Sequence, residues 1–319
     1  MEFVKMHGLG NDFVLLDYFL TEPESDRDSE YENLARKLCH RQFGVGGDGL
    51  LVVLPSERAD ARMRIFNPDG SEPEMCGNGI RCLARYVYER GYVRHNPVRV
   101  ETLAGILSLG IKLAQNNSEV ESAKAQSTKV EDAKAQSTKA ENTKVESIKE
   151  KNAKVESIRV DMGEPILDPE FIPVRSAGKR AIGESLEAEG REFRFTAVSM
   201  GNPHCVIFGE DLSEKDFYHY GPLLEKHPLF PRKTNVEFIT VHSRREMTMR
   251  VWERGAGPTL ACGTGASASA VAAVLNDLID REVTVHLPGG DLLIEWADDN
   301  HVYMTGPAAY AFRGVWLGD

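Results

Sequence analysis

Short runs in which apolar and polar residues alternate recur along most of this chain, and they predict a protein built mainly of β-strands. Residues 98–111 hold two such runs around a Gly-containing turn, which is typical of a β-hairpin, and residues 158–163 predict the next strand. Two segments, 80–87 and 266–274, are instead largely apolar throughout and predict buried helices. The remaining strand-like runs occupy residues 13–17, 50–53, 62–66, 193–198, 247–252, 283–287, 292–296 and 301–304.

The same Gly-rich turn precedes both predicted helices. We therefore expect an internal duplication, in which each half of the chain wraps its own sheet around a central helix headed by cysteine. Such a helix N-terminus lowers the pKa of a thiol and also binds anions, because its first N–H groups have no partner within the helix. The two turns read Met75-Cys76-Gly77-Asn78-Gly79 and Ala261-Cys262-Gly263-Thr264-Gly265.

A matched pair of cysteines at helix ends suggests proton transfer at a carbon atom. If the two ends face one another across a pocket, a carboxylate can bridge both sets of N–H groups, with Cys76 and Cys262 on opposite sides of its α-carbon. One thiolate then removes the α-proton while the other thiol returns a proton. The glycines fit this interpretation, since a backbone that contacts a ligand closely leaves no room for side chains. A structural disulfide, or two buried thiols, is the alternative.

Residues 113–158 differ from the rest of the chain, because they contain no glycine, proline or aromatic residue and repeat with a period of ten. A ten-residue step rotates a helix by about 280° beyond full turns, so no constant apolar face forms and a coiled coil is excluded. We expect a low-complexity insertion, disordered or a solvated helix, with a partner-binding segment as the alternative. The expected domains are 1–112 and 159–305, with the tail 306–319 packing back on the first domain.

Composition narrows the functional classes. At 319 residues the chain has room for two domains, and 41% hydrophobic residues suffice for ordinary cores. The net charge of −11 gives no reason to expect a nucleic-acid partner, and no apolar stretch is long enough to span a membrane. Five cysteines without CxxC spacing argue against disulfides or a metal site. Without a secretory signal, we expect reduced thiols, a cytoplasmic location and small polar molecules as partners.

Six motifs, in their order along the chain, resemble those of the diaminopimelate epimerase family. The resemblance implies an α/β (α+β) fold of two pseudo-symmetric domains, each a curved, mostly antiparallel sheet wrapped around a central helix, with the active site in the cleft between them. It also implies a homodimeric isomerase of lysine and peptidoglycan-precursor biosynthesis, which converts L,L- to meso-2,6-diaminopimelate without pyridoxal phosphate or another cofactor. The motifs are Met6-His7-Gly8-Leu9-Gly10-Asn11-Asp12-Phe13, Phe66-Asn67-Pro68-Asp69-Gly70-Ser71, Met75-Cys76-Gly77-Asn78-Gly79-Ile80-Arg81-Cys82, Ser199-Met200-Gly201-Asn202-Pro203-His204-Cys205, Glu253-Arg254-Gly255-Ala256-Gly257 and Ala261-Cys262-Gly263-Thr264-Gly265-Ala266.

The resemblance also implies roles for individual residues. Cys76 and Cys262 are the acid/base pair, one acting as thiolate and the other as thiol. The carboxylate of the reacting centre is held by the backbones of Gly77, Asn78, Gly263 and Thr264. The distal amino-acid centre, which does not react, is recognised by Asn11, Asn67, Asn202, Asn235, Glu253 and Arg254. Arg254 suits a carboxylate clamp, and Glu253 suits an acceptor for the distal ammonium group.

His204 and Glu253 match family positions that tune the cysteines, since an ionisable neighbour shifts the pKa of a thiol and can receive its proton. A packing role is the equal alternative for His204. Gly49 stands where some family members carry a glutamine that touches substrate, so we expect the backbone or a water molecule to replace that contact. The other cysteines lack a Gly-rich helix end and are expected to be buried apolar residues: Cys39, Cys82 and Cys205.

Three other functions use some of the same residues. A proline or hydroxyproline racemase also uses paired cysteines, but its compact substrate has no distal centre for the asparagines and Glu253-Arg254 to bind. A cysteine hydrolase would pair one thiol with His204 as nucleophile and base, which leaves the second Gly-flanked cysteine unexplained. A non-catalytic amino-acid-binding protein leaves both cysteines without a reaction.

Overall fold

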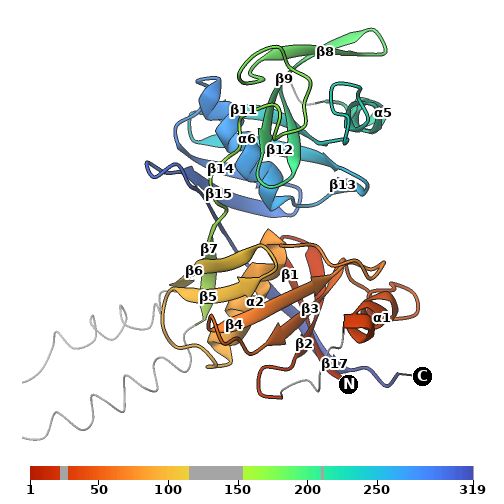
Figure 1. The fold of residues 1–319 in the computed structure, drawn as a ribbon, viewed down its shortest axis with the longest axis vertical. Helices are drawn as coiled ribbons and strands as arrows, with labels where there is room; N and C mark the ends of the chain where they lie inside the picture. The colour runs from red at the N-terminus through yellow and green to blue at the C-terminus, as the bar shows by residue number, and fades with distance from the viewer. Residues whose placement is uncertain (22–27, 115–153, 210–211, 319) are drawn as a thin grey trace, which may run out of the picture.

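The molecule consists of two stacked lobes, each with strands around a helix (Figure 1). The computed structural model describes residues 1–21, 28–114, 154–209 and 212–318. Within these residues the strands far outnumber the helices, as the alternating pattern predicts, and the α/β class is confirmed. No helix among them is long and apolar enough to cross a membrane.

The first lobe is a sheet whose strands pair in chain order. Successive pairs from β1 to β7 are antiparallel, parallel, antiparallel, parallel, antiparallel and antiparallel. The predicted hairpin at residues 98–111 is the β5–β6 pair, in which Thr102 lies opposite Gly105. The strands are β1 (Glu2–Gly8), β2 (Asn11–Asp17), β3 (Gly49–Leu54), β4 (Ala61–Phe66), β5 (Val98–Thr102), β6 (Gly105–Leu113) and β7 (Val155–Asp161).

The second lobe repeats this topology. From β9 to β16, leaving out the short β13, successive pairs are again antiparallel, parallel, antiparallel, parallel, antiparallel and antiparallel. The internal duplication expected from the two cysteine turns is therefore confirmed by the order of strand pairing. The strands are β8 (Glu184–Ala188), β9 (Arg191–Ser199), β10 (Pro203–Phe208), β11 (Asn235–Ser243), β12 (Glu246–Glu253), β13 (Gly257–Thr259), β14 (Glu282–Leu287), β15 (Gly290–Trp296) and β16 (Val302–Gly306).

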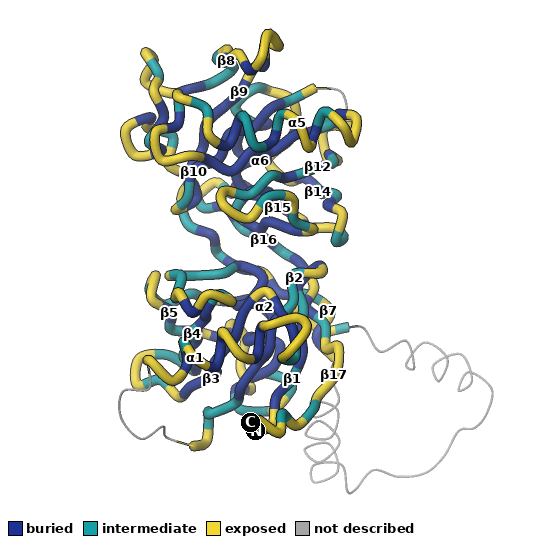
Figure 2. The backbone as a smooth tube through the Cα atoms, turned by 90° about the vertical axis from the view of Figure 1, so that its right-hand side faces the viewer, coloured by how far each residue is buried: buried dark blue, intermediate teal, exposed yellow. Residues whose placement is uncertain are grey.

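The helices lie at the parallel connections of each lobe. Helices α1 (Asp28–Leu38) and α5 (Glu214–Glu225) connect the first parallel pair and cover the outside of the sheets. Helices α2 (Gly77–Glu89) and α6 (Gly263–Leu275) connect the second parallel pair and are buried on nearly every side, as Figure 2 shows. Helix α6 is built almost entirely of Ala, Gly, Ser and Val, and these small residues let the strands close around it.

Two crossing strands hold the lobes together. β7 of the first lobe pairs with β16 of the second, and the chain then returns in β17 (Ala309–Val315), which pairs with β1 (Figure 1). The two termini consequently lie side by side, and the amino group of Met1 donates to the carbonyl oxygen of Trp316 at 2.8 Å. A single apolar core runs through both lobes and includes Met162 and Met304 at the crossing.

The boundary expected at residue 158 is wrong, because β7 already begins at Val155. β6 and β7 form an antiparallel pair that closes at its end, where the Ala114 N–H donates to the Lys154 carbonyl at 2.9 Å. The N–H of Val155 also donates to the carboxylate of Glu89, the last residue of α2, at 3.0 Å. The repeat tract thus departs from the end of α2 opposite to Cys76. Residues 115–153, on which the rest of that prediction falls, lie outside the described residues.

A partly buried ion pair ties the first hairpin to the following loop. Lys5, whose side chain is 7% exposed, lies 2.6 Å from the carboxylate of Asp12, and Arg41 contacts the other oxygen at 2.9 Å. Burial raises the pKa of Asp12, but hydrogen bonds from Lys5 and Arg41 outweigh it, so the pKa lies below the ordinary value. Removing the carboxylate leaves the Lys5 ammonium group buried without its counter-charge.

Joining Ala114 to Lys154 through a two-residue Asn-Gly turn, with residues 115–153 removed, is expected to leave the fold intact. These two residues already hydrogen-bond to each other, so the shortened hairpin keeps its register. Shortening the loop to two residues changes the free energy of unfolding by only about 2–3 kcal/mol, since each halving of loop length contributes about 0.6 kcal/mol. Thermal unfolding followed by circular dichroism measures the effect, and loss of the cooperative transition would show that the removed residues carry part of the fold.

The substitution Asp12→Asn is expected to lower the free energy of unfolding by about 2 kcal/mol, because it strands a buried ammonium group. Since the pKa of Asp12 is lowered, its stabilising effect is present above the ordinary aspartate pKa and is lost as the pH falls through the lowered value. Urea unfolding across this acidic range measures both effects. Asp280→Asn, which breaks an exposed pair with Arg244, is the control and should change stability little; equal losses would contradict the argument.

Candidate active site

Each of the two cysteines is the N-cap of a central helix. Cys76 precedes α2 with extended backbone angles, φ −142° and ψ 115°, and Cys262 precedes α6 with φ −126° and ψ 108°. Each sulfur accepts a hydrogen bond from the third residue of its helix, Gly79 or Gly265, at 3.4 Å. Neither first turn carries an acidic side chain, so the first N–H groups remain available to an anion. The predicted helix-end position of both cysteines is confirmed.

Both helix ends open into one cleft of about 1650 Å³ between the lobes. The side chain of Asn78 crosses from one turn to the other, since its Nδ2 donates to the carbonyl oxygen of Ala261 at 3.4 Å. The structure therefore brings the two predicted turns together, as the sequence interpretation required. The predicted site residues that line the cleft are Asn11, Asn67, Cys76, Gly77, Asn78, Asn202, Glu253, Arg254, Cys262, Gly263 and Thr264.

One buried methionine contacts both turns. A Cβ atom on Gly77 would lie 3.1 Å from Cε of Met304, and a Cβ atom on Gly263 would lie 2.8 Å from its sulfur. Met304 belongs to β16, the crossing strand, and is fully buried. These glycines are thus required by the packing at the crossing as well as by any close approach of a ligand. The sequence analysis missed Met304, because its strand pattern does not show which element it faces.

The surroundings of Cys76 contain a buried cation. Arg81 is fully buried, and its guanidinium donates to Oδ1 of Asn78 at 2.8 Å and to the carbonyl oxygen of Gly77 at 3.0 Å. Burial raises the pKa of Cys76 and the carboxylate of Glu253 raises it further, while the N–H groups of Gly79 and Asn78 and the charge of Arg81 act in the opposite direction. Arg81 therefore fixes the first turn and favours the thiolate there.

The surroundings of Cys262 are more acidic. Burial raises the pKa of Cys262 well above the ordinary value, and the carboxylates of Glu253 and Glu237 raise it further. The hydroxyl of Thr264, 3.5 Å from the sulfur, and the N–H of Gly265 lower it. Burial also raises the pKa of Glu253, whose carboxylate accepts a hydrogen bond from Thr259. The two sulfurs thus share a helix-end geometry and differ in the charges around them.

His204 does not line the cleft and contacts neither cysteine. It is fully buried, with Nδ1 at 2.7 Å from Oε1 of Glu237 and Nε2 at 2.9 Å from Oδ1 of Asn202. Because both ring nitrogens are occupied, the expectation that His204 takes a proton directly from a cysteine has no geometric support. Glu237 was missed by the sequence analysis, although an acidic residue inside the apolar run of β11 is the signal that marks it.

Asn235 also lies behind the cleft wall. It is 4% exposed, its Nδ2 donates to the Pro203 carbonyl at 2.9 Å, and its Oδ1 accepts the N–H of Arg254 at 2.9 Å. The expected direct contact of Asn235 with substrate therefore does not match its position. Its amide instead fixes the backbone of Arg254. The exposed Arg254 side chain lines the cleft and forms no ion pair with any described carboxylate.

Gly49 begins β3 and is buried away from the cleft lining. A Cβ atom there would lie 3.1 Å from the Phe66 carbonyl oxygen and 3.3 Å from the ring of Phe13, so the strand packing favours glycine. The polar groups that line this part of the cleft are Arg41 and Asp48, which form an ion pair at 2.7 Å. The sequence analysis considered only Gly49 of the run Gly46-Gly47-Asp48-Gly49 and so missed Asp48, and Arg41 lies in no motif that points to ligand contact.

The other three cysteines are buried, as expected from their sequence setting: Cys39, Cys82 and Cys205. Burial raises the pKa of Cys39 and of Cys82 to about 12. For Cys205, burial and the neighbouring Glu237 raise the pKa well above the ordinary value. None of the three lines the cleft, which leaves Cys76 and Cys262 as the cysteines of the candidate site.

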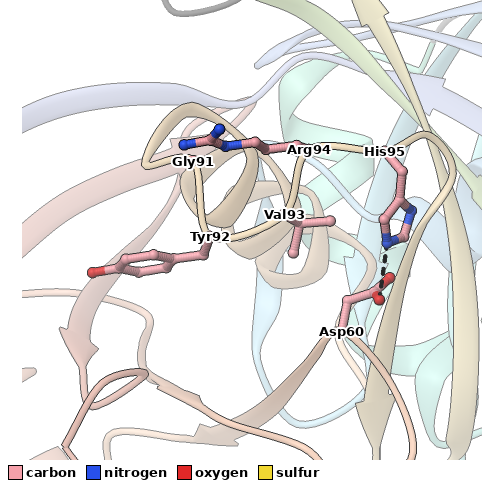
Figure 3. A pocket seen from close by; sticks show the side chains of 6 residues that line it. All are labelled: Asp60, Gly91, Tyr92, Val93, Arg94 and His95. Atoms are coloured by element: carbon pink, nitrogen blue, oxygen red, sulfur yellow. Dashed lines mark hydrogen bonds and ion pairs between the residues drawn. The ribbon is translucent and has the colours of Figure 1, made fainter.

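A second depression, shown in Figure 3, lies on the surface of the first lobe and measures about 430 Å³. It is lined by Asp60 and by residues 91–95, which follow α2. His95 lies between Oδ1 of Asp60 at 3.1 Å and the Pro97 carbonyl at 3.0 Å, and Asp60 also accepts the Arg99 N–H at 2.7 Å. These groups satisfy one another and fasten the loop to β5.

Comparisons with known proteins agree with this geometry. The family described as diaminopimelate epimerase matches residues 3–130 and 196–311. A diaminopimelate epimerase of Desulfitobacterium hafniense is 61% identical over 319 residues, which is 100% of this chain and 99% of that protein. A diaminopimelate epimerase of Moorella thermoacetica is 51% identical and covers 98% of each chain.

Solved structures with the same fold have far lower sequence identity. A PhzF-family phenazine biosynthesis protein of Bacillus anthracis aligns over 99% of both chains with a TM-score of 0.62 and 17% identity. A hydroxyproline epimerase of Agrobacterium vitis, with bound trans-4-hydroxy-L-proline, aligns over 98% of this chain and 90% of its own, with a TM-score of 0.62 and 14% identity. These likenesses concern the fold.

The substitution Gly265→Ala is expected to lower the free energy of unfolding by about 1–3 kcal/mol, through overpacking beneath the first turn of α6. The added Cβ would lie 2.8 Å from Oε1 of Glu237, which is fully buried, and 3.2 Å from the Cys262 sulfur. Gly110→Ala, whose Cβ meets nothing closer than 3.5 Å, is the matched control. Urea unfolding of both variants decides the matter, and equal stabilities would show that the turn has space.

Proposed function

The chain belongs to the diaminopimelate epimerase family, and we propose that it converts L,L- to meso-2,6-diaminopimelate by exchanging one α-proton between Cys76 and Cys262 without a cofactor. The observation that carries this proposal is the pair of cysteine N-caps that open into one cleft. The family places the enzyme among the isomerases and its product in lysine biosynthesis and in the supply of peptidoglycan precursors.

The reaction needs a base on one face of the α-carbon and an acid on the other. We assign these roles to the two sulfurs, while the first N–H groups of α2 and α6 hold the carboxylate attached to that carbon. The assigned N–H groups belong to Gly77, Asn78, Gly263 and Thr264. Burial raises the pKa of both thiols. A raised pKa makes the thiolate a stronger base and the thiol a weaker acid. The high pKa therefore suits abstraction of a weakly acidic proton.

The charges around the two sulfurs favour one protonation state of the free enzyme. Cys76 has the cation Arg81 near it as well as the carboxylate of Glu253, whereas Cys262 has two carboxylates, Glu253 and Glu237. A thiolate is stabilised by the cation and destabilised by the carboxylates. We therefore assign the thiolate to Cys76 and the thiol to Cys262 before substrate binds.

The cleft is larger than its substrate requires. Its volume of about 1650 Å³ exceeds the roughly 300–1,000 Å³ typical of small-molecule pockets. For two sulfurs to reach opposite faces of one carbon, the lobes must approach each other and expel water, which also strengthens the interactions of the helix ends with the substrate. The β7–β16 crossing, with Met304 between the turns, is where we place that movement.

Recognition of the distal centre distinguishes this substrate from a single amino acid. We assign the distal carboxylate to the guanidinium of Arg254, and the distal ammonium to Glu253, with amide groups of the cleft completing the contacts. The amides come from Asn11, Asn67 and Asn202. Asn235 serves this site indirectly, since it holds the backbone of Arg254.

The alternatives explain less of the site. A proline or hydroxyproline racemase shares the fold, but its substrate has no second centre for Arg254 and the cleft amides to bind. A cysteine hydrolase needs a base in contact with its thiol, and both ring nitrogens of His204 are occupied by Glu237 and Asn202. A binding protein without activity gives no reason for two cysteine N-caps at one cleft.

The cellular location that we propose follows from the cysteine chemistry. The five cysteines are free, and a reaction that needs a thiol and a thiolate requires the reducing environment of the cytoplasm, where we place the protein.

We also propose a homodimer. The edge strand β17 pairs only with β1 among the described strands, and it carries exposed Phe312 and Val315, which an isologous contact would cover. Light scattering of the purified protein tests this assembly.

Cys76→Ala and Cys262→Ala are each expected to lower turnover by about 10²–10⁴-fold, since each removes one member of the acid/base pair. The protein is incubated with L,L-diaminopimelate in D₂O without added cofactor, and NMR follows deuterium uptake and meso product. Cys82→Ala, which alters a buried cysteine on the same helix, is the matched control and should remain active. Reduced, folded wild type that yields neither deuterium uptake nor meso product would overturn the proposal.

Arg254→Lys is expected to raise the KM for diaminopimelate by about tenfold, because an ammonium group cannot form the paired contact of a guanidinium with a carboxylate. The same change should leave kcat within a few-fold, as the distal centre does not react. Steady-state kinetics measure both constants. Arg244→Lys, in an exposed ion pair with Asp280, is the control. An unchanged KM in Arg254→Lys would show that Arg254 does not bind the distal carboxylate.

A further inference from the structure

A chain of hydrogen bonds leads from the interior of the second lobe to the sulfur of Cys262. Oε1 of Glu237 lies 2.7 Å from Nδ1 of His204, and Nε2 of His204 lies 2.9 Å from Oδ1 of Asn202. Nδ2 of Asn202 then donates to Oγ1 of Thr264 at 3.2 Å, and that oxygen lies 3.5 Å from the Cys262 sulfur. Glu237 and His204 are fully buried, so the chain is anchored in the core and ends in the cleft.

The orientation of Asn202 gives the chain a direction. Its carbonyl oxygen faces His204, so Nε2 of His204 carries the hydrogen of that bond. Its amide nitrogen faces Thr264, so the Thr264 oxygen accepts there and its own hydrogen is free to point to the sulfur. From His204 onward each link therefore donates toward Cys262, which is the arrangement that stabilises a thiolate, whereas Nδ1 of His204 donates in the other direction, to the Glu237 carboxylate.

The chain acts by orientation and not by proton transfer. An amide group does not pass a proton from its nitrogen to its oxygen at neutral pH, so Asn202 interrupts any relay between Cys262 and His204. What the buried His204–Glu237 pair can do is hold Asn202 with its amide nitrogen toward Thr264. The Thr264 hydroxyl is then left with one good acceptor, the sulfur.

Glu237 is costly to bury, which argues that its place has a use. Its Oε2 atom is buried without a hydrogen-bond partner among the described residues. Such a group lowers the stability of the fold, so its presence calls for a functional explanation. It lies directly beneath the first turn of α6, where Oε1 would be 2.8 Å from a Cβ on Gly265. The charged groups that act on Cys262 are the carboxylates of Glu253 and Glu237. A hydroxyl that donates to the sulfur stabilises the Cys262 thiolate, which the two carboxylates destabilise.

We propose that the side chain of Thr264 is a positioning residue for Cys262, and that Glu237 and His204, through Asn202, set the direction in which its hydroxyl donates. This deepens the function proposed above and rests on it only for the reaction that the thiolate serves. In that reaction Cys262 must alternate between thiol and thiolate. The hydrogen bond from the Thr264 hydroxyl stabilises the thiolate, whereas the neighbouring carboxylates destabilise it.

The test measures the Cys262 thiolate directly, without substrate. Full-length wild type, Thr264→Val and Thr264→Ser are treated with iodoacetamide over a range of pH, and mass spectrometry follows alkylation of Cys262 and Cys76 in the same sample. Valine keeps the shape of threonine and removes its hydroxyl, whereas serine keeps the hydroxyl. Cys76 is the internal control, because its sulfur has no bond to Thr264.

Loss of the hydroxyl is expected to slow alkylation of Cys262 at neutral pH by about 10–100-fold, the effect of a lost hydrogen bond to a charged acceptor. Thr264→Ser should restore the wild-type rate, and the Cys76 rate should stay unchanged in all three proteins. An unchanged or faster Cys262 rate in Thr264→Val would overturn the proposal, because a faster rate means that the hydroxyl accepts from the thiol. Equal changes at both cysteines would also overturn it.

The direction of the chain has its own measurement. The ¹⁵N chemical shifts of the His204 ring in the wild-type protein should show a hydrogen on Nε2, and an Nε2 without hydrogen would reverse the chain and overturn the proposal. Because neither measurement uses diaminopimelate, a failure here leaves the epimerase assignment standing. A failure of deuterium exchange in wild type would instead remove that assignment and leave the thiolate result intact.

Discussion

The structure depends on one arrangement, in which a cysteine side chain caps each of two buried helices and the two capped ends face a common cleft. A helix N-terminus gives the sulfur a hydrogen bond from Gly79 or Gly265 and leaves further N–H groups for a ligand. Capping by serine or aspartate would use the same geometry, but only a thiol combines it with a proton that exchanges near neutral pH. The local requirement of the helix and the chemical requirement of the reaction are thus met by one residue.

Facing the helix ends toward each other requires the rest of the fold. Each helix lies at the second parallel connection of its own lobe, so the duplicated strand order places both at equivalent positions. The β7–β16 pair then joins the sheets, and Met304 of β16 packs between Gly77 and Gly263. Small residues along α6 let the strands close around it. The site is therefore positioned by core packing and not by the loops around it.

The two sulfurs are equivalent in backbone geometry and different in electrostatics. Arg81 is buried beside Cys76, where it donates to the backbone and to Asn78. Glu237 and Glu253 lie near Cys262, and a hydrogen-bond chain through His204 reaches the same sulfur. In the proposed reaction one cysteine is a thiolate and the other a thiol when substrate binds, and this difference in surroundings favours such a state. The repeated topology supplies the geometry, and the side chains that differ between the two helix ends supply the asymmetry.

Much of the fold could be read from the sequence, because it rests on local signals. Short strand-like runs predicted the strands β2, β3, β4, β9, β12, β14, β15 and β16, and the two Gly-rich turns predicted the helices α2 and α6. A continuous apolar run does not by itself distinguish a strand from a helix, and β10 and β11 were missed although the similar buried run of β3 was found. Helices α1 and α5 were missed because each is largely polar and packs through only a few residues.

The sequence by itself determined the chemistry: two thiols at helix ends, glycines beside them, and amides, a carboxylate and a guanidinium for a polar substrate. Only the tertiary structure decided which of these groups reach the cleft. Asn235 and His204 carry the right functional groups, yet their strands turn both side chains into the interior, where they hold Arg254 and Asn202 in place. Arg41, Asp48, Arg81, Glu237 and Met304 come into the site from other elements. The reason is physical, since helix ends and turns follow from neighbouring residues, whereas the direction of a side chain across a sheet depends on strands far away in the chain.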